Sequence, residues 1–328
     1  MIDFTKCPTT LKTYGGANGN KISVKYNGEI YMLKFPSHPP KNPAQTYTNG
    51  CVSEYIGSNI FASVGISAQE TILGTYKRRG KECLVVACKD FTSPGTILQD
   101  FASLKNSAID TGHSGSGTEL SEILDAINEQ NFMDPVILLQ HFWNMFIVDA
   151  WIGNWDRHNG NWGFLYDQNN ETISLAPIFD CGSCLYPQAD EKIMQSTLDD
   201  EKEMNFRLYE IPLSAIRIDG KKINYHDFIT SLENKECNAA LERIVPRLDL
   251  QKVSEIIEGT PCITDLQKEF YNRMLVNRKE RILDKALELL QEKERKYYNF
   301  GEILEWASEI KRNDSSVPEI NDDFELDR

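Results

Sequence analysis

Two pairs of β-prone runs in the first 90 residues constrain the fold more than any other feature of this sequence. Residues 21–26 (KISVKY) and 29–35 (EIYMLKF) are separated only by Asn27 and Gly28, a dipeptide that strongly favours a tight hairpin turn. Residues 69–76 and 81–88 form a second pair of the same kind. These runs predict a small antiparallel sheet in the N-terminal part of the chain.

Helical patterns dominate the remainder of the chain. Residues 48–64, between the two hairpins, repeat apolar side chains at helical spacing. A longer apolar segment, 134–153, starts with Asp134 as a plausible N-cap and Pro135 at the first helical position. A further helix is predicted to begin at the capping box of residues 264–267.

Because strands and helices are segregated along the chain, the sequence predicts an α+β protein with two lobes. The small lobe, residues 1–91, would hold the sheet and one helix, and the large lobe, residues 92–312, would be mainly helical, with a cleft between them. A chain of 328 residues is long enough to form both. Residues 313–328 are acidic and are predicted to be a disordered tail.

The charge balance limits the partners of the protein. The chain carries 35 Lys and Arg against 49 Asp and Glu, a formal net charge of −14. Such a surface repels phosphate backbones and anionic lipids, so we expect no nucleic-acid partner and no stable membrane association, although a local phosphate pocket is still compatible. No secretory signal opens the sequence, and polar residues interrupt the apolar segment 136–153, which we interpret as a buried helix. The expected location is the cytoplasm, with secretion as an effector by another route left open.

Eight cysteines in a chain of this length do not indicate a disulfide scaffold. Cys181 and Cys184 are the one close pair, and no second pair accompanies them at the spacing of zinc ligands. We interpret them as two reduced cysteines in a tight turn.

Two features of the predicted small lobe are typical of phosphate binding. A glycine-rich segment follows Tyr14, and its backbone N–H groups could approach an anion closely. Lys34 lies on a predicted strand, with Glu54 on the helix 20 residues later, which is how kinase-like folds hold the α- and β-phosphates. A simple glycine turn and an unpaired surface lysine are the alternatives. The residues of the glycine-rich segment are Gly15, Gly16, Ala17, Asn18 and Gly19.

Polar residues also flank a third predicted hairpin, residues 162–178. Asp156 and Asn161 precede it with the Asp-x-x-x-x-Asn spacing of kinase catalytic loops, and Asp180 follows its second strand. Because the ends of antiparallel strands meet at the open end of a hairpin, Asn161 and Asp180 are expected to converge, with Asp156 nearby. Mg²⁺ prefers such oxygen ligands together with nucleotide phosphates. The alternative is a hairpin with merely polar ends.

In this order and on these elements, the motifs resemble those of the HipA-like Ser/Thr protein kinases, and particularly the compact, secreted type. The resemblance covers roughly residues 14–300. It is carried by GGANGNK (15–21), KFP (34–36), TNGC and SEY (48–55), ACKDF (87–91), NWDRHNGNWGF (154–164) and PIFDCGSCLYP (177–187).

The resemblance implies a two-lobed protein-kinase-like fold with ATP and Mg²⁺ in the cleft. It implies Asp156 as the catalytic base, Asn161 and Asp180 as metal ligands, and a protein substrate with a Ser or Thr acceptor. It also implies autophosphorylation and the activity of a toxin. In HipA a phosphate-loop Ser is autophosphorylated, and the nearest hydroxyl here is that of Thr13.

On the nucleotide side, the resemblance implies that Lys34, oriented by Glu54, contacts the phosphates, with His158 near them. Residues 85–91 would form the hinge between the lobes, where backbone groups of Ala87 and Lys89 would bind the adenine edge. HipA contacts its antitoxin through an N-terminal extension, whereas the kinase-like region here begins almost at Met1, so we expect no antitoxin partner bound in that way.

Two other functions remain open from the sequence. A small-molecule or phosphoinositide kinase shares the Asp-Arg-His-x-x-Asn loop, although the net charge argues against docking on anionic lipid. A non-catalytic, pseudokinase-like effector is the second alternative. All the catalytic positions hold residues that are competent for catalysis, which argues against it. The sequence identifies neither the protein substrate nor the oligomeric state.

Overall fold

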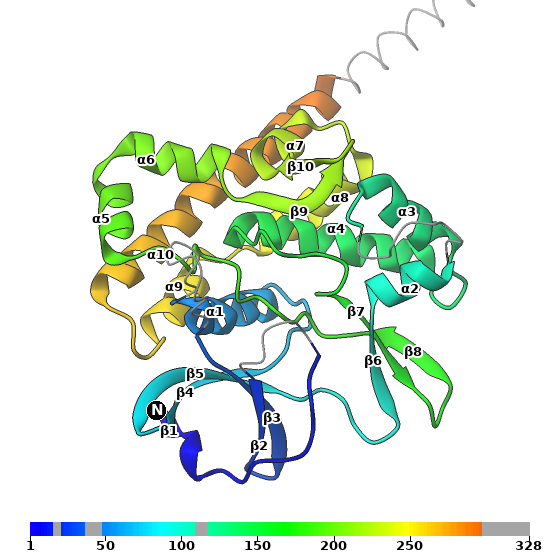
Figure 1. Ribbon diagram of the computed structural model, residues 1–328. Coiled ribbons are helices and arrows are strands. Elements are labelled where there is room, and N and C mark those ends of the chain that lie inside the picture. The colour runs from blue at the N-terminus through cyan, green and yellow to red at the C-terminus, as the bar shows by residue number, and fades with distance from the viewer. Residues whose placement is uncertain (16–20, 37–47, 109–116, 297–328) are drawn as a thin grey trace, which may run out of the picture.

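The computed structural model describes residues 1–15, 21–36, 48–108 and 117–296, and it shows a small sheet-rich lobe beside a larger helical one (Figure 1). The predicted tail, residues 313–328, lies outside the described residues, as do Gly16, Ala17, Asn18 and Gly19 of the glycine-rich segment. The α+β class and the two-lobed arrangement predicted from the sequence are confirmed.

The small lobe is built on a five-stranded sheet in the order β1-β4-β5-β3-β2. Both predicted hairpins are present, and β1, which was not predicted, adds to the edge of the sheet parallel to β4. The strands are β1 (Ile2–Asp3), β2 (Lys21–Tyr26), β3 (Glu29–Lys34), β4 (Thr71–Arg78) and β5 (Lys81–Lys89), and a short 3₁₀ turn, η1 (Phe4–Lys6), follows β1.

Alternation along β3 determines which side chains face the single helix of the small lobe, α1 (Gly50–Ser63). Tyr31 and Leu33 pack on one face of the sheet in a cluster with Phe4. Met32 lies on the opposite face with Cys51 of α1. Because side chains two residues apart share a face, Lys34 points to the same side as Met32 and therefore towards α1.

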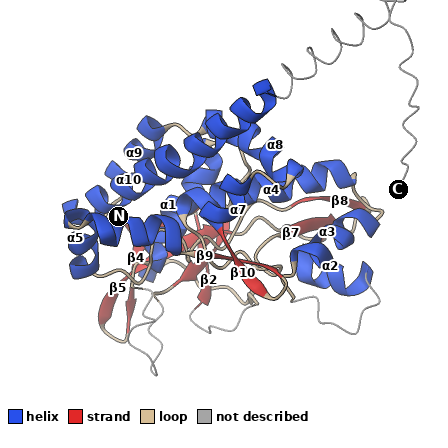
Figure 2. Ribbon diagram, turned by 90° about the horizontal axis from the view of Figure 1, so that it is seen from above, coloured by secondary structure: helices blue, strands red, loops and turns tan. Residues whose placement is uncertain are grey.

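The large lobe is mainly helical, and α4, α8, α9 and α10 lie together on one side of it (Figure 2). The helices are α2 (Phe101–Ala108), α3 (Leu120–Glu129), α4 (Pro135–Ile152), α5 (Glu191–Asp199), α6 (Glu201–Asn205), α7 (Tyr225–Ser231), α8 (Lys235–Ile244), α9 (Leu250–Glu258) and α10 (Asp265–Arg278). Irregular turns are η3 (Phe206–Glu210), η4 (Val245–Arg247) and η5 (Lys279–Asp284), after which the chain stays helical to residue 296.

Two small sheets lie among the helices of the large lobe. β6 (Thr96–Asp100), β7 (Gly163–Asp167) and β8 (Thr172–Leu175) form one antiparallel sheet, of which only the β7–β8 hairpin was predicted. β9 (Leu213–Ile218) and β10 (Lys221–Asn224) form a separate hairpin. The predicted boundary between residues 91 and 92 falls in the segment that joins β5 to β6.

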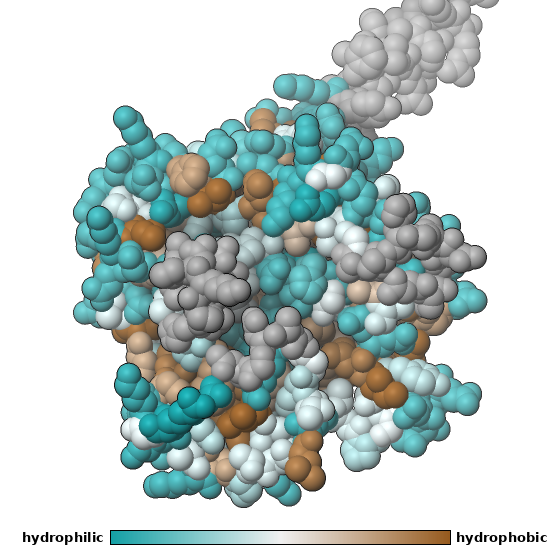
Figure 3. Space-filling view, viewed as in Figure 1, coloured by the Kyte–Doolittle hydropathy of each residue, from teal (hydrophilic) through white to brown (hydrophobic). Residues whose placement is uncertain are grey.

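The long apolar helix α4 is the centre of the large-lobe core. Its N-terminus is as predicted, since Asp134 accepts a hydrogen bond from the N–H of Val136 and Pro135 opens the helix. Within the described ranges it is the one helix long and apolar enough to cross a membrane, but 61% of it is buried inside the protein. It is therefore the buried helix that the sequence predicts, and hydrophilic side chains cover much of the large-lobe surface around it (Figure 3).

Candidate active site

Lys34 lies between two carboxylates. Its Nζ donates to Glu54 Oε2 at 2.8 Å and to Asp180 Oδ1 at 2.9 Å. The predicted pair of Lys34 and Glu54 is thus formed. The second bond, to Asp180, joins Lys34 of the small lobe to the segment that follows β8. Burial would lower the pKa of Lys34, but the carboxylates of Asp180 and Glu54 hold that pKa well above its ordinary value.

Glu54 is buried and uses its two oxygens on different partners. Oε2 accepts from Lys34, and Oε1 accepts from the backbone N–H of Cys181 at 3.1 Å. Gly182 lies close beside it, because a Cβ there would be only 3.0 Å from Glu54 Oε2. Glu54 of α1 is therefore held by Lys34 of β3 and by the backbone of the turn after Asp180.

Asp180 holds an unusual backbone conformation at the end of the β7–β8 unit. Its φ is +57°, in the left-handed region that Asp tolerates better than most residues, as is often found at functional sites. Lys34 holds the pKa of Asp180 at about 2, although burial alone would raise it. The side chain is 41% exposed, so the carboxylate is charged at neutral pH and still reaches solvent.

Asp156 lies in the loop that follows α4. Gly153 ends that helix in the left-handed conformation, and Asn154 Oδ1 then accepts from the backbone N–H of Asp156 at 3.2 Å. Burial raises the pKa of Asp156, and the charge of Asp180 adds to the rise while His158 opposes it. A carboxylate with a raised pKa is suited to accept a proton.

Asn161 and Asp180 converge at the open end of the hairpin, as its strand ends predict. The side-chain Nδ2 of Asn161 donates to the carbonyl oxygen of Asp156 at 2.8 Å, which leaves the amide oxygen as the atom that could bind a cation. Within the described part of the chain, no group of three His, Cys, Asp or Glu side chains could hold a metal ion by itself. One amide and one carboxylate do fit Mg²⁺, which takes most of its remaining ligands from phosphates and water.

Arg157 holds these elements together, a role that the sequence analysis did not assign. One nitrogen, Nη1, donates to the carbonyl oxygens of Asn161 at 2.7 Å and Phe179 at 2.5 Å, and so ties the two ends of the hairpin to each other. Nε donates to Asp149 of α4 at 2.9 Å, and both side chains of this pair are buried. The sequence does show Arg157 as a charged residue in a loop after a buried helix. Its spacing alone, however, could not identify Asp149 as its partner.

The other predicted nucleotide residues are placed differently. Gly15 is exposed at the end of a described segment, and its carbonyl oxygen accepts from Lys21 Nζ at 3.0 Å. His158 is exposed, and its Nδ1 accepts from the N–H of Gly160 at 3.0 Å. Lys34 lowers the pKa of Asp180 most, and Lys21, which binds Gly15, lowers it further. Burial raises the pKa of Asp156, and His158 opposes that rise.

Ala87 and Lys89 are not brought into the site by their backbone groups. Ala87 is paired with Leu33 on one side and Ile72 on the other, inside the sheet. The N–H of Lys89 donates to Glu70 O at 2.8 Å, and its carbonyl oxygen accepts from Gln69 Nε2 at 2.9 Å. These bonds hold the backbone of the predicted hinge within the small lobe, and the N–H of Asp90 also donates to the sheet, at Ile30 O.

Cys181 and Cys184 are free and buried in a turn, in agreement with the prediction for this pair. The N–H of Cys184 donates to the carbonyl oxygen of Cys181 at 3.2 Å. The turn packs against α1 so closely that a Cβ on Gly57 would be 2.8 Å from Cys184 Sγ. The two cysteines therefore form part of the surface against which α1, the helix that carries Glu54, is packed.

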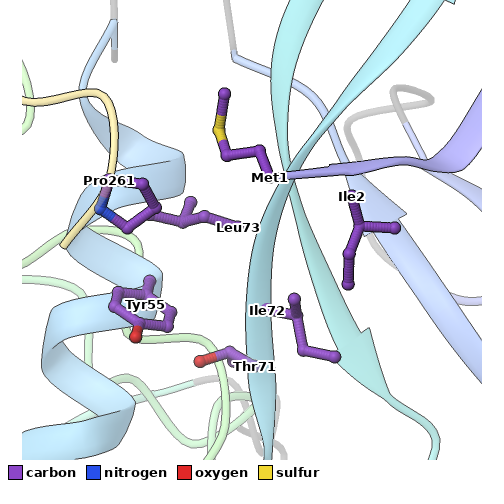
Figure 4. Close-up of a pocket in the computed structure, with 7 residues that line it drawn as sticks. All are labelled: Met1, Ile2, Tyr55, Thr71, Ile72, Leu73 and Pro261. Atoms are coloured by element: carbon purple, nitrogen blue, oxygen red, sulfur yellow. The ribbon is translucent and has the colours of Figure 1, made fainter. Parts of the chain in front are cut away.

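A pocket on the outer side of α1 is separate from this site (Figure 4). None of the predicted catalytic or nucleotide residues lines it. Its walls are Met1, Ile2, Tyr55, Thr71, Ile72, Leu73 and Pro261.

Comparisons with known proteins agree with this arrangement. The family described as the HipA-like C-terminal domain matches residues 13–251. The Ser/Thr-protein kinase CtkA of Helicobacter pylori strain J99 is 50% identical over 287 residues, which are 87% of this chain and 87% of that protein.

Solved structures are similar as well. The crystal structure of the proinflammatory kinase CtkA of Helicobacter pylori matches with a TM-score of 0.83 and 50% identity, over 89% of this chain and 98% of that one. HipA of Shewanella oneidensis MR-1, in a complex with HipB and operator DNA, matches with a TM-score of 0.52 and 15% identity, over 85% and 69%, which is a likeness of fold alone. Because the family match covers more than half of the chain, this protein belongs to the HipA-like C-terminal domain family.

Proposed function

We propose that this protein is a Ser/Thr protein kinase that transfers the γ-phosphoryl group of ATP, with Mg²⁺, to a protein hydroxyl. The 50% identity with CtkA over most of both chains supports the class of enzyme. The observation that carries the use of ATP and Mg²⁺ is the placement of Lys34 between Glu54 and Asp180, with Asp156 and Asn161 close by.

Lys34 is the group we assign to the α- and β-phosphates. It stays charged because two carboxylates raise its pKa, and its side chain is still 15% exposed on the cleft side. Glu54 orients the ammonium, so that no side-chain entropy has to be lost when the phosphates bind. Lys21 and His158 would add positive charge or hydrogen-bond donors at the edges of the same site.

Asn161 and Asp180 are the residues we assign to Mg²⁺, which when bound would neutralise charge on the phosphates. The low pKa of Asp180, about 2, keeps its carboxylate charged at neutral pH. Arg157 keeps the two ligands at one place by holding the carbonyl oxygens of Asn161 and Phe179.

Asp156 is the proposed catalytic base. Its carboxylate would accept the proton of the acceptor hydroxyl while that oxygen attacks the γ-phosphorus and the β–γ bridging bond breaks. Adenine is expected at the hinge, residues 85–91, and its last residue, Phe91, is the candidate contact, because the N–H groups of Lys89 and Asp90 already donate to Glu70 O and Ile30 O. Autophosphorylation belongs to this proposal, and the exposed Thr13 beside the glycine-rich segment is a candidate acceptor.

The test is incubation of the full chain with γ-labelled ATP and Mg²⁺, with a mixed protein acceptor, for wild type and Asp156→Ala. We expect Asp156-dependent label on Ser or Thr of protein, and nucleotide binding that survives the substitution, because the carboxylate acts on the acceptor. Label on a small molecule or a phosphoinositide instead would favour the alternative kinases. Transfer at near-normal rates by Asp156→Ala would show that the base is assigned wrongly, and no transfer by wild type would favour an effector without catalysis.

A further inference from the structure

The β9–β10 hairpin is fixed beside the catalytic loop on two sides. Tyr225, the residue after β10, donates its hydroxyl to the carbonyl oxygen of Asn154 at 2.6 Å. On the other side, the N–H of Arg217 in β9 donates to Thr118 O at 2.8 Å, and the neighbouring Gly117 O accepts from Asn159 Nδ2 at 2.7 Å. Both ends of the loop that carries Asp156 are thus connected to this hairpin.

The hairpin carries two cations directly opposite each other. Arg217 on β9 and Lys222 on β10 are register partners, so their side chains share one face. Like charges at such positions destabilise a sheet, which makes the pair unfavourable for folding alone. Lys222 is exposed, and the guanidinium of Arg217 donates to the carbonyl oxygen of Gly220, at 2.6 Å, within its own turn. Among the described residues, no carboxylate forms an ion pair with either.

The charge of Lys222 acts on Asp156. Burial raises the pKa of Asp156, and Lys222 is one of the cations that oppose the rise, after His158. The acidic groups on the hairpin side are Asp219 at its tip and Glu119, whose Oε2 accepts from the N–H of Gly220 at 3.1 Å. Neither is paired with Lys222.

We propose that Arg217 and Lys222 bind an acidic residue of the substrate protein close to the Ser or Thr that is phosphorylated. The inference rests on the proposed kinase function and names its substrate class, an acceptor site flanked by Asp or Glu. A protein with a net charge of −14 repels acidic segments over most of its surface, so two adjacent cations beside the base select where such a segment can dock. The phosphates of ATP already have Lys34 on the small-lobe side, which leaves this pair to the acceptor.

A positional peptide library tests the proposal. Each peptide contains one Ser, and each flanking position in turn is fixed as Asp, Ala, Lys or phosphoserine. For the wild type we expect kcat/KM to be about tenfold higher with Asp than with Ala at one or two positions, an advantage that shrinks in 0.5 M NaCl because the contact is at the surface. Phosphoserine at those positions distinguishes a preference for phosphate from one for carboxylate.

Lys222→Glu is the decisive variant, and Lys81→Glu is its matched control. Lys81 lies opposite Arg78 in the β4–β5 hairpin, another exposed pair of like charges, at the end of β5 away from the hinge. In Lys222→Glu the Asp-to-Ala ratio should fall about tenfold and the Lys-to-Ala ratio should rise, whereas Lys81→Glu should keep both ratios. Ratios are used because a charge change near Asp156 alters the rate with every peptide.

The outcomes separate the two levels of the argument. Asp156-dependent transfer to all peptides with equal kcat/KM, or ratios that Lys222→Glu leaves unchanged, would overturn the acidic-substrate inference and leave the kinase function intact. A Lys222-dependent preference for phosphoserine without one for Asp would overturn the assignment to carboxylates. Wild-type protein that labels neither peptides nor proteins would refute the kinase function and the inference with it.

Discussion

Replacing Arg157 with Met should destabilise this protein more than any substitution of a residue proposed to touch substrate. The guanidinium and the carboxylate of Asp149 are 3% and 1% exposed, so neither charge has water to replace its partner. Removal of one member of a buried ion pair costs about 3–5 kcal/mol, because the other charge is left uncompensated. Methionine retains most of the apolar stem, so the loss of packing adds little.

The cost can be compared with the whole stability of a domain. Proteins are commonly stable by about 5–15 kcal/mol, so a loss of about 3–5 kcal/mol in Arg157→Met should remove roughly a fifth or more of that amount. The variant also frees the carbonyl oxygens of Asn161 and Phe179, which Nη1 joins in the wild type. Transfer activity should therefore fall even at temperatures at which the variant remains folded.

Urea denaturation of four proteins measures the pair: wild type, Arg157→Met, Asp149→Asn and the double variant. We expect the double variant to be more stable than the sum of the single losses by about 1–3 kcal/mol, since it leaves no lone buried charge. Losses that add, or an Arg157→Met variant within 1 kcal/mol of the wild type, would refute the reasoning.

The pH dependence of Arg157→Met supplies an independent check. Burial raises the pKa of Asp149, and Arg157 opposes that rise. Without Arg157 the folded-state pKa should rise further above the unfolded value. Such a group stabilises the fold below its unfolded pKa and loses that contribution as pH rises through the folded pKa. The stability gap between variant and wild type should therefore be smaller at pH 5 than at pH 8.

Three further predictions concern the proposed nucleotide site. Asp180→Ala should weaken ATP binding only when Mg²⁺ is present, and calorimetry with and without Mg²⁺ would measure this; an unchanged Mg²⁺ dependence would remove Asp180 from the site. Lys34→Met should lower transfer by about 100-fold and also lower the Tm, since it leaves the buried carboxylate of Glu54 without its cation, and Glu54→Gln should lower transfer by less; normal turnover in both would show that Lys34 does not contact the phosphates. Gly57→Ala would place a Cβ 2.8 Å from Cys184 Sγ, so it should displace α1 and raise the KM for ATP, and steady-state kinetics equal to wild type would show that the turn yields instead.

The parts of the site that could be predicted follow from local periodicity. Lys34 could be aimed at α1 because strand side chains alternate, and Asn161 could be placed near Asp180 because a hairpin brings its ends together. The hydrogen bonds of the predicted hinge could not be predicted in the same way. Nothing in the local pattern of residues 81–89 shows that Gln69 would occupy the carbonyl oxygen of Lys89.

The β9–β10 hairpin was missed although its signal is present in the sequence. Asp219 and Gly220 form a turn dipeptide as strong as Asn27 and Gly28, between Leu213–Ile218 and Lys221–Asn224. β6 was missed for a different reason, because its partner β7 lies more than 60 residues away in the chain. Arg157 likewise obtains its role from Asp149 and from two carbonyl oxygens, and carbonyl partners leave no trace in side-chain patterns.

Glu54 of helix α1 links the two lobes, because its carboxylate accepts hydrogen bonds from Lys34 of β3 and from the N–H of Cys181. The packing of α1 determines which of these bonds is stretched when the small sheet moves. The apolar side chains Val52, Ile56 and Phe61 belong to the same core as α4, whereas Cys51 meets the small sheet. α1 therefore packs against both lobes, and the bond between Glu54 and the N–H of Cys181 ties it to the turn after Asp180. A shift of the small sheet relative to α1 must then stretch the bonds of Lys34 to Glu54 and Asp180, both of which start from β3. Lys34 is consequently positioned only while the small sheet packs against α1. Loss of this packing should lower transfer without any change in the residues around Asp156.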